Sequence, residues 1–279
     1  MGEHPAGPGM PAEPAPLNGI KHSLAIASGK GGVGKSTVSV NLAVALAQAG
    51  AATGLLDADL YGPSIPILTG TSRMPENTGH KLLPVEAHGV RLMSLGFLMP
   101  DGAPVIWRGP MVSGAIQQFL QDVEWGSLDY LLVDLPPGTG DAQLTLAQSL
   151  PLAGAVIVMT PQDLAMHIAS KALAMFQQLK VPILGIIENM SSFVCPHCGR
   201  RSAISRQGGA RRASEHLGVP FLGEIPLDPR VCQTSDRGEP IVTSIPDSPV
   251  AEAFRRVSAA LAERVGEEGP SAPVIRLGK

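Results

Sequence analysis

The sequence predicts an α/β fold in which a doubly wound, mostly parallel sheet carries helices on both faces. From about residue 22 onward, short apolar runs alternate with longer segments of helical periodicity. The apolar runs show little alternation with polar residues, which is typical of parallel strands buried on both faces. With 279 residues, 44% of them hydrophobic, the chain is long enough to bury a substantial core.

The predicted elements follow one another in a regular order. Strands are expected at residues 23–28, 53–59, 90–96, 129–138, 154–160, 181–190 and 219–226. Helical patterns occupy 36–50, 111–122, 141–150, 162–179, 208–217 and, last, 248–265. In open α/β sheets ligands bind beyond the carboxyl ends of the strands, so the residues that follow each strand are the candidates for function.

We expect one domain for the folded part of the chain, because that part shows no internal repeat and no shift in amino-acid composition along its length. We expect a disordered leader at 1–17, where Pro, Gly and Ala dominate. The leader has no apolar centre and no Arg, which argues against a secretory signal and a mitochondrial transit peptide. The domain itself is expected at 18–266 and a flexible tail at 267–279.

Charge and cysteine content narrow the range of partners. A net charge of −3 and a pI near 6.2 do not suggest an electrostatic nucleic-acid binder. No apolar run reaches the roughly 18–20 residues of a membrane-spanning helix, so we expect neither nucleic acid nor membrane as a partner. Three cysteines are too few for a disulfide framework, which favours a cytoplasmic location.

The strongest functional signal is a glycine-rich loop between the first strand and the first helix. Gly29, Gly34, Lys35 and Ser36 fit the pattern G-x-x-x-x-G-K-[ST], in which backbone N–H groups cradle phosphates. The lysine reaches the β- and γ-phosphates, and the serine hydroxyl binds Mg²⁺. Lys30 is a second cation that this motif does not need. The other residues of the predicted nucleotide site are Gly31, Gly32, Val33 and Thr37.

Carboxylates end two of the predicted strands. Asp57, Asp59 and Asp134 can hold Mg²⁺, directly or through water, or orient an attacking water. We expect Asp57 and Asp134 to join Ser36 in a Mg²⁺ site, and Asp57 and Asp59 to have different tasks. A capping role is the alternative for Asp57 and Asp59. Gly138 is expected to offer its N–H to the γ-phosphate.

A C-x-x-C motif forms a predicted metal-binding loop at 194–200. Cys195 and Cys198 have the spacing at which two thiolates of one tight turn converge on a metal or cluster. A second C-x-x-C is missing, so two chains related by a two-fold axis are needed to supply four cysteines, enough for a [4Fe–4S] cluster. A bridging Zn²⁺, a redox pair and an empty motif remain alternatives. We expect Cys232 to pack as a small hydrophobe.

The ordered set of motifs resembles a known family. "KGGVGKST" is similar to the deviant Walker A motif of dimeric P-loop ATPases, the class that includes the nitrogenase iron protein and the chromosome- and septum-positioning ATPases. "DADLYGPSIP", "WRGPMVSGAI", "DYLLVDLPPGTGD", "TPQD" and "CPHCG" resemble the Mrp/NBP35 iron–sulfur carriers. The resemblance runs from about residue 19 to 265 and fits a short form without an extra N-terminal domain.

The resemblance implies roles for individual residues. Lys30 reaches across a face-to-face homodimer to the phosphates of the other subunit, much as an arginine finger acts in trans. Lys35 and Asp59 complete the catalytic set, with Asp59 positioning the attacking water. Asp134 holds Mg²⁺-bound water, and Asn189 contacts adenine.

The function implied is that of an ATP-hydrolysing carrier, using ATP and Mg²⁺. It receives a labile [4Fe–4S] cluster from a donor and transfers it to apo-proteins. Two other functions share the phosphate loop. A positioning ATPase acting on DNA or membrane would carry the C-x-x-C motif as a structural zinc knuckle. A nucleotide-dependent reductase would keep its cluster and pass electrons.

Overall fold

A computed structural model describes residues 17–59, 62–79, 81–98, 109–161, 165–195, 198, 200–203 and 208–267. Of the leader predicted at 1–17 only Leu17 is among them, and of the tail predicted at 267–279 only Glu267; the rest of both segments lies outside the described residues. Within these ranges we find no helix whose length and apolar character would let it cross a bilayer.

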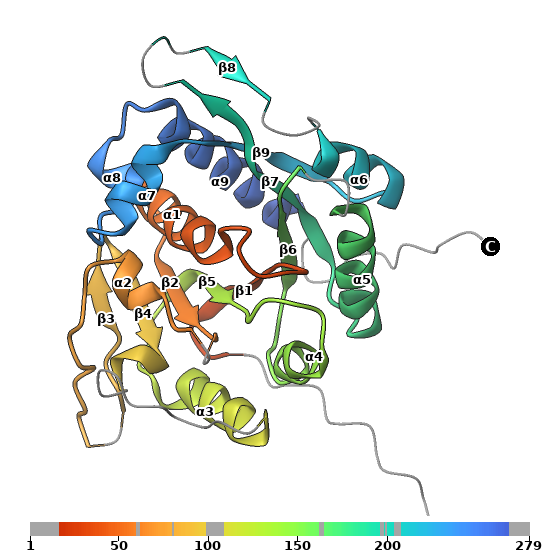
Figure 1. Cartoon of the computed structure of the whole chain (residues 1–279). Helices are drawn as coiled ribbons and strands as arrows, with labels where there is room; N and C mark the ends of the chain where they lie inside the picture. Colours follow the sequence, from red (N-terminus) through yellow and green to blue (C-terminus); the bar gives the residue numbers. More distant parts are fainter. Residues whose placement is uncertain are drawn as a thin grey trace, which may run out of the picture.

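Nine strands of the described residues form one sheet (Figure 1). They are β1 (Ile20–Ala27), β2 (Thr53–Asp57), β3 (Val85–Ala87), β4 (Val90–Ser94), β5 (Leu128–Asp134), β6 (Gly154–Met159), β7 (Ile183–Val194), β8 (Arg201–Ser202) and β9 (Phe221–Leu227). The order is β3-β4-β2-β5-β1-β6-β7-β8, and β9 also pairs with β7. The pairs β3–β4 and β7–β8 are antiparallel and the other pairings are parallel, which confirms the mostly parallel sheet.

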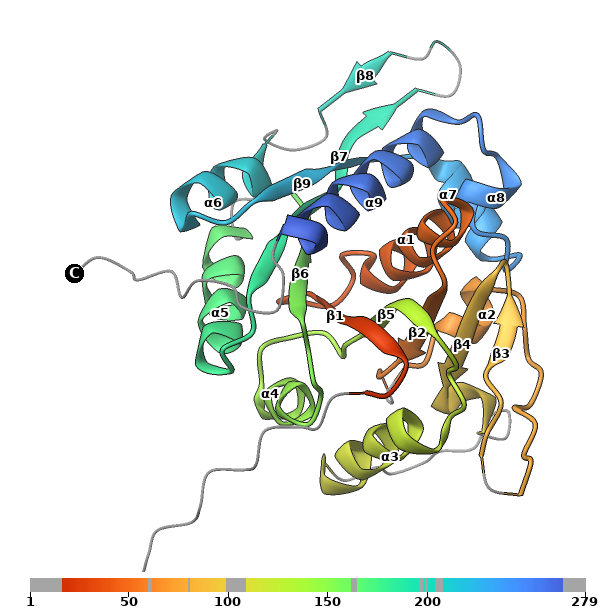
Figure 2. The same ribbon diagram turned by 180° about the vertical axis from the view of Figure 1, so that it is seen from behind.

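Helices cover both faces of this sheet, as Figures 1 and 2 show from opposite sides. On one face lie α1 (Lys35–Gln48), α2 (Ile65–Leu68), α8 (Ile241–Ser244) and α9 (Pro249–Glu267). On the other lie α3 (Gly109–Asp122), α4 (Asp141–Gln148), α5 (Ala165–Gln178) and α6 (Gly209–Leu217). The remaining helical segments are the 3₁₀ turn Leu95–Phe97 and α7 (Pro229–Ser235).

The central strand β1 shows why the sheet must be covered twice. Leu24 and Ile26 belong to the core under α1 and α9, whereas Ala25 and Ala27 belong to the core under α4 and α5. All four are fully buried. Successive side chains of a strand point to opposite faces, so an unbroken apolar run requires a core on each side. The absence of polar alternation in the sequence therefore predicted the doubly wound fold correctly.

The largest departure from the predicted elements concerns β7. The sequence predicts a strand over 181–190, but the strand runs from Ile183 to Val194 and reaches the cysteine motif. The apolar run that predicted the strand ends before Ser191 and Ser192. Because serine is polar, the pattern did not show that the strand continues through these two residues, although both are buried. The short elements α2, β3, β8, α7 and α8 have too few residues for a periodic pattern, and the sequence did not predict them.

Candidate functional site

The glycine-rich loop connects β1 to α1 at the carboxyl edge of the sheet. Gly34 precedes the helix in the left-handed conformation, with φ of 77°, and Gly32 has φ of 76°. Residues other than glycine adopt such φ angles at a cost in free energy, because their β-carbon crowds the following carbonyl group. Ser28 Oγ donates to the carbonyl oxygen of Lys30 at 3.0 Å and closes the start of the loop. The loop therefore holds the chain in the shape that leaves N–H groups for an anion.

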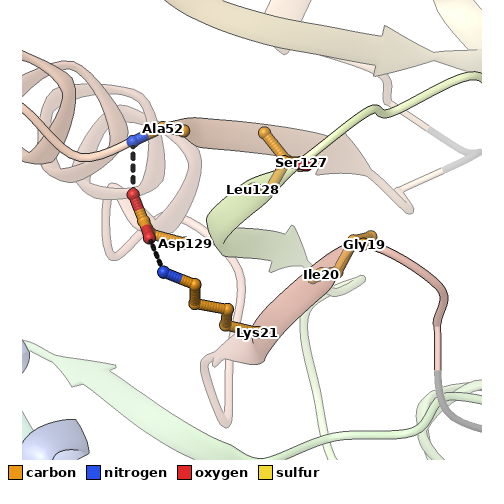
Figure 3. Close-up of a pocket in the computed structure, with 7 residues that line it drawn as sticks. All are labelled: Gly19, Ile20, Lys21, Ala52, Ser127, Leu128 and Asp129. Carbon is orange, nitrogen blue, oxygen red and sulfur yellow. Dashed lines mark hydrogen bonds and ion pairs between the residues drawn. The ribbon is translucent and has the colours of Figure 1, made fainter.

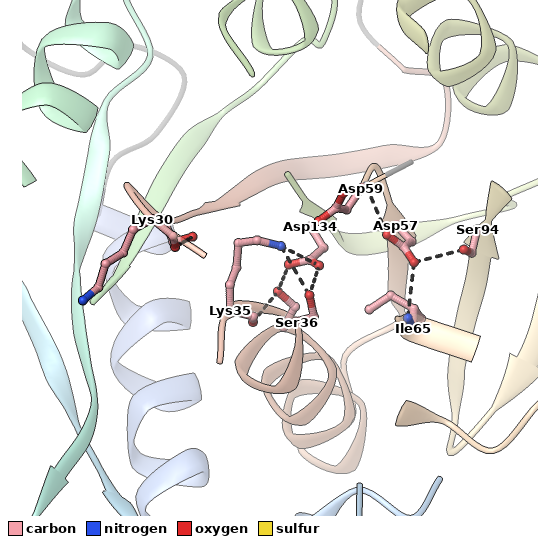
Figure 4. Close-up of polar contacts among 10 residues, drawn as sticks. Lys30, Lys35, Ser36, Asp57, Asp59, Ile65, Ser94 and Asp134 are labelled. Atoms are coloured by element: carbon pink, nitrogen blue, oxygen red, sulfur yellow. Dashed lines mark hydrogen bonds and ion pairs between the residues drawn. The ribbon is translucent and has the colours of Figure 1, made fainter. Parts of the chain in front are cut away.

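Lys35 and Asp134 form a buried ion pair at the base of the loop. Lys35 Nζ lies 2.7 Å from Asp134 Oδ2, and the side chains are 6% and 0% exposed. The hydroxyl groups of Ser36 and Ser39 each donate to this carboxylate at 2.6 Å. Figure 4 shows the three side chains of Lys35, Ser36 and Asp134 pointing toward one another. A carboxylate and a hydroxyl in contact are the oxygen ligands that Mg²⁺ prefers, so the donor set fits the ion.

Asp57 ends β2 next to Asp134, with which it is paired in the sheet register. Its carboxylate accepts hydrogen bonds from the N–H of Asp59 at 3.1 Å, the N–H of Ile65 at 3.2 Å and Ser94 Oγ at 3.0 Å. Burial, and secondly the nearby charge of Asp134, raises the pKa of Asp57 to about 7. Because three protein donors already surround this carboxylate, a role toward Mg²⁺ fits contact through water better than direct ligation.

Asp59 stands in a different environment from Asp57. It follows the end of β2 and is partly exposed, whereas Asp57 is 1% exposed. Asp57 holds the first turn of α2 through Ile65, so the capping role considered for it is present. The two aspartates thus lie in different environments, and their expected separate tasks stay a prediction. The catalytic role of Asp59 stays a prediction.

Gly138, predicted to offer its N–H to the γ-phosphate, bonds within the protein. Its N–H donates to the carbonyl oxygen of Ser28 at 2.9 Å, so the phosphate contact predicted for it requires that bond to open. Its φ of 108° allows a loop there that other residues would strain. The bond ties the segment after β5 to the segment after β1.

Asn189 lies against the phosphate loop. Its Nδ2 donates to the carbonyl oxygen of Val33 at 2.8 Å, and the side chain is 7% exposed. The predicted adenine contact therefore has to share this amide with the loop. Sequence reasoning placed Asn189 at the ligand edge correctly but missed that it supports the loop.

Lys30 points away from Lys35 and Asp134 (Figure 4). Its side chain is partly exposed. The predicted action on a nucleotide of another subunit is compatible with this direction.

The two cysteines of the motif lie at the tip of a hairpin made by β7 and β8. Phe193 pairs with Ser202, Val194 pairs with Arg201, and the N–H of Cys195 donates to the carbonyl oxygen of Arg200 at 3.0 Å. Cys195 is partly exposed and Cys198 is exposed. Among the described residues no group of three or more His, Cys, Asp or Glu could hold a metal ion.

The chain leaving this hairpin is fixed on the same strand from which the hairpin begins. The N–H of Ala210, in the first turn of α6, donates to Glu188 Oε2 at 2.7 Å. Glu188 is 1% exposed, and its burial raises the pKa of the carboxyl group. Both ends of the cysteine segment are therefore anchored on β7.

The prediction for Cys232 was wrong. The residue lies on α7 and is exposed, so it does not pack as a small hydrophobe. The buried residues of this short helix are Thr234 and Ser235. The seven residues of α7 are too few to reveal its buried face from periodicity.

A separate hollow of about 450 Å³ opens at the opposite edge of the sheet (Figure 3). Gly19, Lys21, Ala52 and Asp129 are among the residues that line it, and Lys21 Nζ lies 2.7 Å from Asp129 Oδ1. These residues lie at the amino ends of β1, β2 and β5, whereas the phosphate loop follows the carboxyl end of β1. None of the predicted site residues lines this hollow.

Comparison with known proteins identifies the family of this chain. A family model described as ParA, NUBPL iron-transfer P-loop NTPase, matches residues 19–262. The chain belongs to this family. The iron–sulfur cluster carrier protein of Aquifex aeolicus is 50% identical over 250 residues, which cover 88% of this chain and 69% of the relative. The iron–sulfur protein required for NADH dehydrogenase in mitochondria of Arabidopsis thaliana is 52% identical, covering 86% of this chain and 77% of the relative.

Solved structures give the same P-loop NTPase fold. A nucleotide-binding protein of Archaeoglobus fulgidus, described in complex with ADP and with cobalt, is 42% identical with a TM-score of 0.75. The match covers 85% of this chain and 93% of that protein. The cell division ATPase MinD of Pyrococcus furiosus is 22% identical with a TM-score of 0.65, over 87% of this chain and 99% of MinD. The second likeness shows the fold alone.

Proposed function

We propose that this iron-transfer P-loop NTPase is an ATP-hydrolysing carrier of iron–sulfur clusters. It holds a labile [4Fe–4S] cluster between two subunits and passes it from a donor to apo-proteins in the reducing cytoplasm. The observation that carries the proposal is the pair Cys195 and Cys198, at the tip of a hairpin whose first strand also supports the phosphate loop. The names of relatives near 50% identity support the same cargo.

The nucleotide half of the proposal rests on the loop and its carboxylates. Backbone N–H groups from Gly29 to Thr37 bind the phosphates of ATP, and Lys35 turns from Asp134 toward the β- and γ-phosphates. Ser36 and Asp134 hold Mg²⁺, with Asp57 acting through water. Mg²⁺ supplies charge neutralisation on the phosphate oxygens. Asp59 orients the attacking water.

The subunit arrangement follows from charge and from the number of thiols. Lys30 of one subunit reaches the phosphates held by its partner, which makes hydrolysis depend on the homodimer. Two cysteines from each chain complete the four thiolates of the cluster. A cluster held at an interface that changes with the nucleotide is easily released. This coupling is how ATP turnover drives transfer.

Anaerobic reconstitution with iron and sulfide tests the proposal. Three forms are compared by metal content, sulfide content and mass: wild type, Cys195→Ala/Cys198→Ala, and Cys232→Ala as the matched control. We expect about four iron and four sulfide per wild-type dimer. The double variant loses them while still binding ADP, and the Cys232 variant keeps them.

Two results would contradict the proposal. Tightly bound zinc without sulfide makes the C-x-x-C motif a structural knuckle. A full cluster in the double variant would show that Cys195 and Cys198 are not its ligands.

A further inference from the structure

Strand β7 contains an irregular stretch between the residue that supports the phosphate loop and the cysteines. Met190 has φ of 58°, in the left-handed region, although it is not glycine and lies within a strand. The pairing with β9 also slips here. Asn189 pairs with Ile225 and Phe193 with Leu227, so four steps along β7 correspond to two along β9. Such bulges redirect a strand and are frequent beside functional sites.

The unusual backbone of Met190 brings two neighbouring side chains to one glycine. Consecutive side chains of a regular strand point to opposite faces. A β-carbon placed on Gly34 would nevertheless lie 2.4 Å from Asn189 Nδ2 and 3.5 Å from the methyl carbon of Met190. Asn189 and Met190 therefore both reach the glycine that begins α1. A shift of Gly34 toward β7 would bring it against the side chains of Asn189 and Met190.

The bulge also leaves a hydrogen-bonding group unused. The hydroxyl of Ser192 is buried, and it finds no hydrogen-bond partner within the described residues. Its neighbour Ser191 donates to the carbonyl oxygen of Ile225 at 3.3 Å. A buried polar group without a partner costs free energy, as does a left-handed methionine. Strained residues of this kind persist only where the surrounding structure holds them, and they cluster at active sites and switch regions.

We propose that Met190 is a positioning residue that transmits the state of the phosphate loop to the cysteine hairpin. Phosphates entering the loop move Gly34, the Met190 side chain follows, and the bulge at 190–192 changes its twist. Cys195 lies five residues beyond Met190, about 17 Å along an extended strand, so a small change of twist swings the hairpin tip. The inference deepens the proposed function, on which it rests. It supplies the physical link between nucleotide state and cluster release.

Thiol alkylation of the cluster-free protein tests this link without a cluster. All variants carry Cys232→Ser, so that only Cys195 and Cys198 react. Alkylation rates are measured without nucleotide, with saturating Mg·ADP, and with a saturating non-hydrolysable Mg·ATP analogue. Protein concentrations are chosen at which light scattering gives one oligomeric state throughout. In the Cys232→Ser background we expect nucleotide to change the rate at least about fivefold, the lower end of typical allosteric coupling.

Three substitutions separate the role of the side chain from that of the backbone. Met190→Gly accepts the left-handed conformation but removes the side chain that reaches toward Gly34, and we expect the nucleotide effect to fall below about twofold. Met190→Leu keeps an apolar side chain of similar volume and retains the effect. Lys180→Gly is the matched control, since Lys180 has φ of 56° outside β7, and it retains the effect as well.

Each outcome has one meaning. A nucleotide effect that survives in Met190→Gly, or that is absent in the Cys232→Ser background, overturns the coupling role of Met190. If Lys180→Gly loses the nucleotide effect to the same extent, general relaxation of the backbone explains the loss, and the coupling role of Met190 is again overturned. Failure of reconstitution, by contrast, refutes the carrier function and leaves the alkylation result standing.

Discussion

Lys35 Nζ lies 2.7 Å from Asp134 Oδ2, and both groups are buried. The phosphate-loop lysine is thus paired with the carboxylate that ends β5. Lys21 and Asp129 are separated by the same 2.7 Å at the opposite edge of the sheet, but their side chains are 71% and 34% exposed. The two pairs differ in burial and not in distance. This contrast makes the second pair a control for the first.

Asp134→Asn should destabilise the nucleotide-free protein by about 3–5 kcal/mol, because it leaves the Lys35 cation buried without a counter-charge. Asp129→Asn should leave the free energy of unfolding unchanged, since water screens that pair. Mg²⁺-free ADP should raise the melting temperature of Asp134→Asn more than that of wild type, because its phosphates replace the lost carboxylate. Denaturant unfolding and thermal melts measure both effects. Equal losses of unfolding free energy in the two variants would show that burial does not set the contribution of the Lys35–Asp134 pair to stability.

Asp57 should make stability fall as the pH rises. Its pKa in the folded state is about 7 against an ordinary value of 3.8, so the folded protein binds this proton more tightly than the unfolded chain does. The stabilising contribution is full below about pH 4 and is lost as the pH rises through 7.

Comparison with a variant isolates this pH effect. Between pH 5 and 8, in EDTA and without nucleotide, wild type should lose about 2–3 kcal/mol more than Asp57→Asn. Urea unfolding at both pH values gives the difference. The same pH dependence in both proteins would assign the effect to other groups.

Gly34 and Asn189 should show strong energetic coupling. Gly34→Ala meets two penalties, the positive φ of 77° and the approach of its β-carbon to Asn189 Nδ2. In an Asn189→Ala background only the first remains, at about 1–2 kcal/mol. A double-mutant cycle in urea measures the difference, which we expect to exceed about 1 kcal/mol. Additive losses would mean that the loop moves away from Asn189 without resistance.

Lys30 and Lys35 should complement each other between subunits. Lys30→Ala and Lys35→Ala homodimers should each be nearly inactive as ATPases, since a trans-acting cation contributes about 10³–10⁵-fold in related chemistry. In a mixed dimer, one of the two sites combines Lys35 of the first variant with Lys30 of the second. An equimolar mixture should therefore regain about a quarter of wild-type hydrolysis. A mixture as inactive as its components would place Lys30 in its own subunit's site.

The parts of the site that the sequence predicted are those encoded in short, continuous segments. The loop from Gly29 to Thr37, and Asp57 and Asp134 at strand ends, follow from local pattern plus the rule that parallel strands end at one edge. The bond from Gly138 to Ser28, the support of Val33 by Asn189 and the backbone of Met190 arise where distant segments meet. No local pattern encodes such pairings. The exposure of Cys232 was missed because α7 is too short to show its buried side.

The anchoring of α6 through Ala210 and Glu188 has a consequence for engineering and for evolution. Since β7 holds both ends of the cysteine segment, a different loop placed between them would start and end at the same two points. Lengthening a flexible loop costs little, about 0.6 kcal/mol for each doubling. Loops with other ligand sets can therefore be tried between these two anchors while the phosphate loop and its carboxylates are left unchanged.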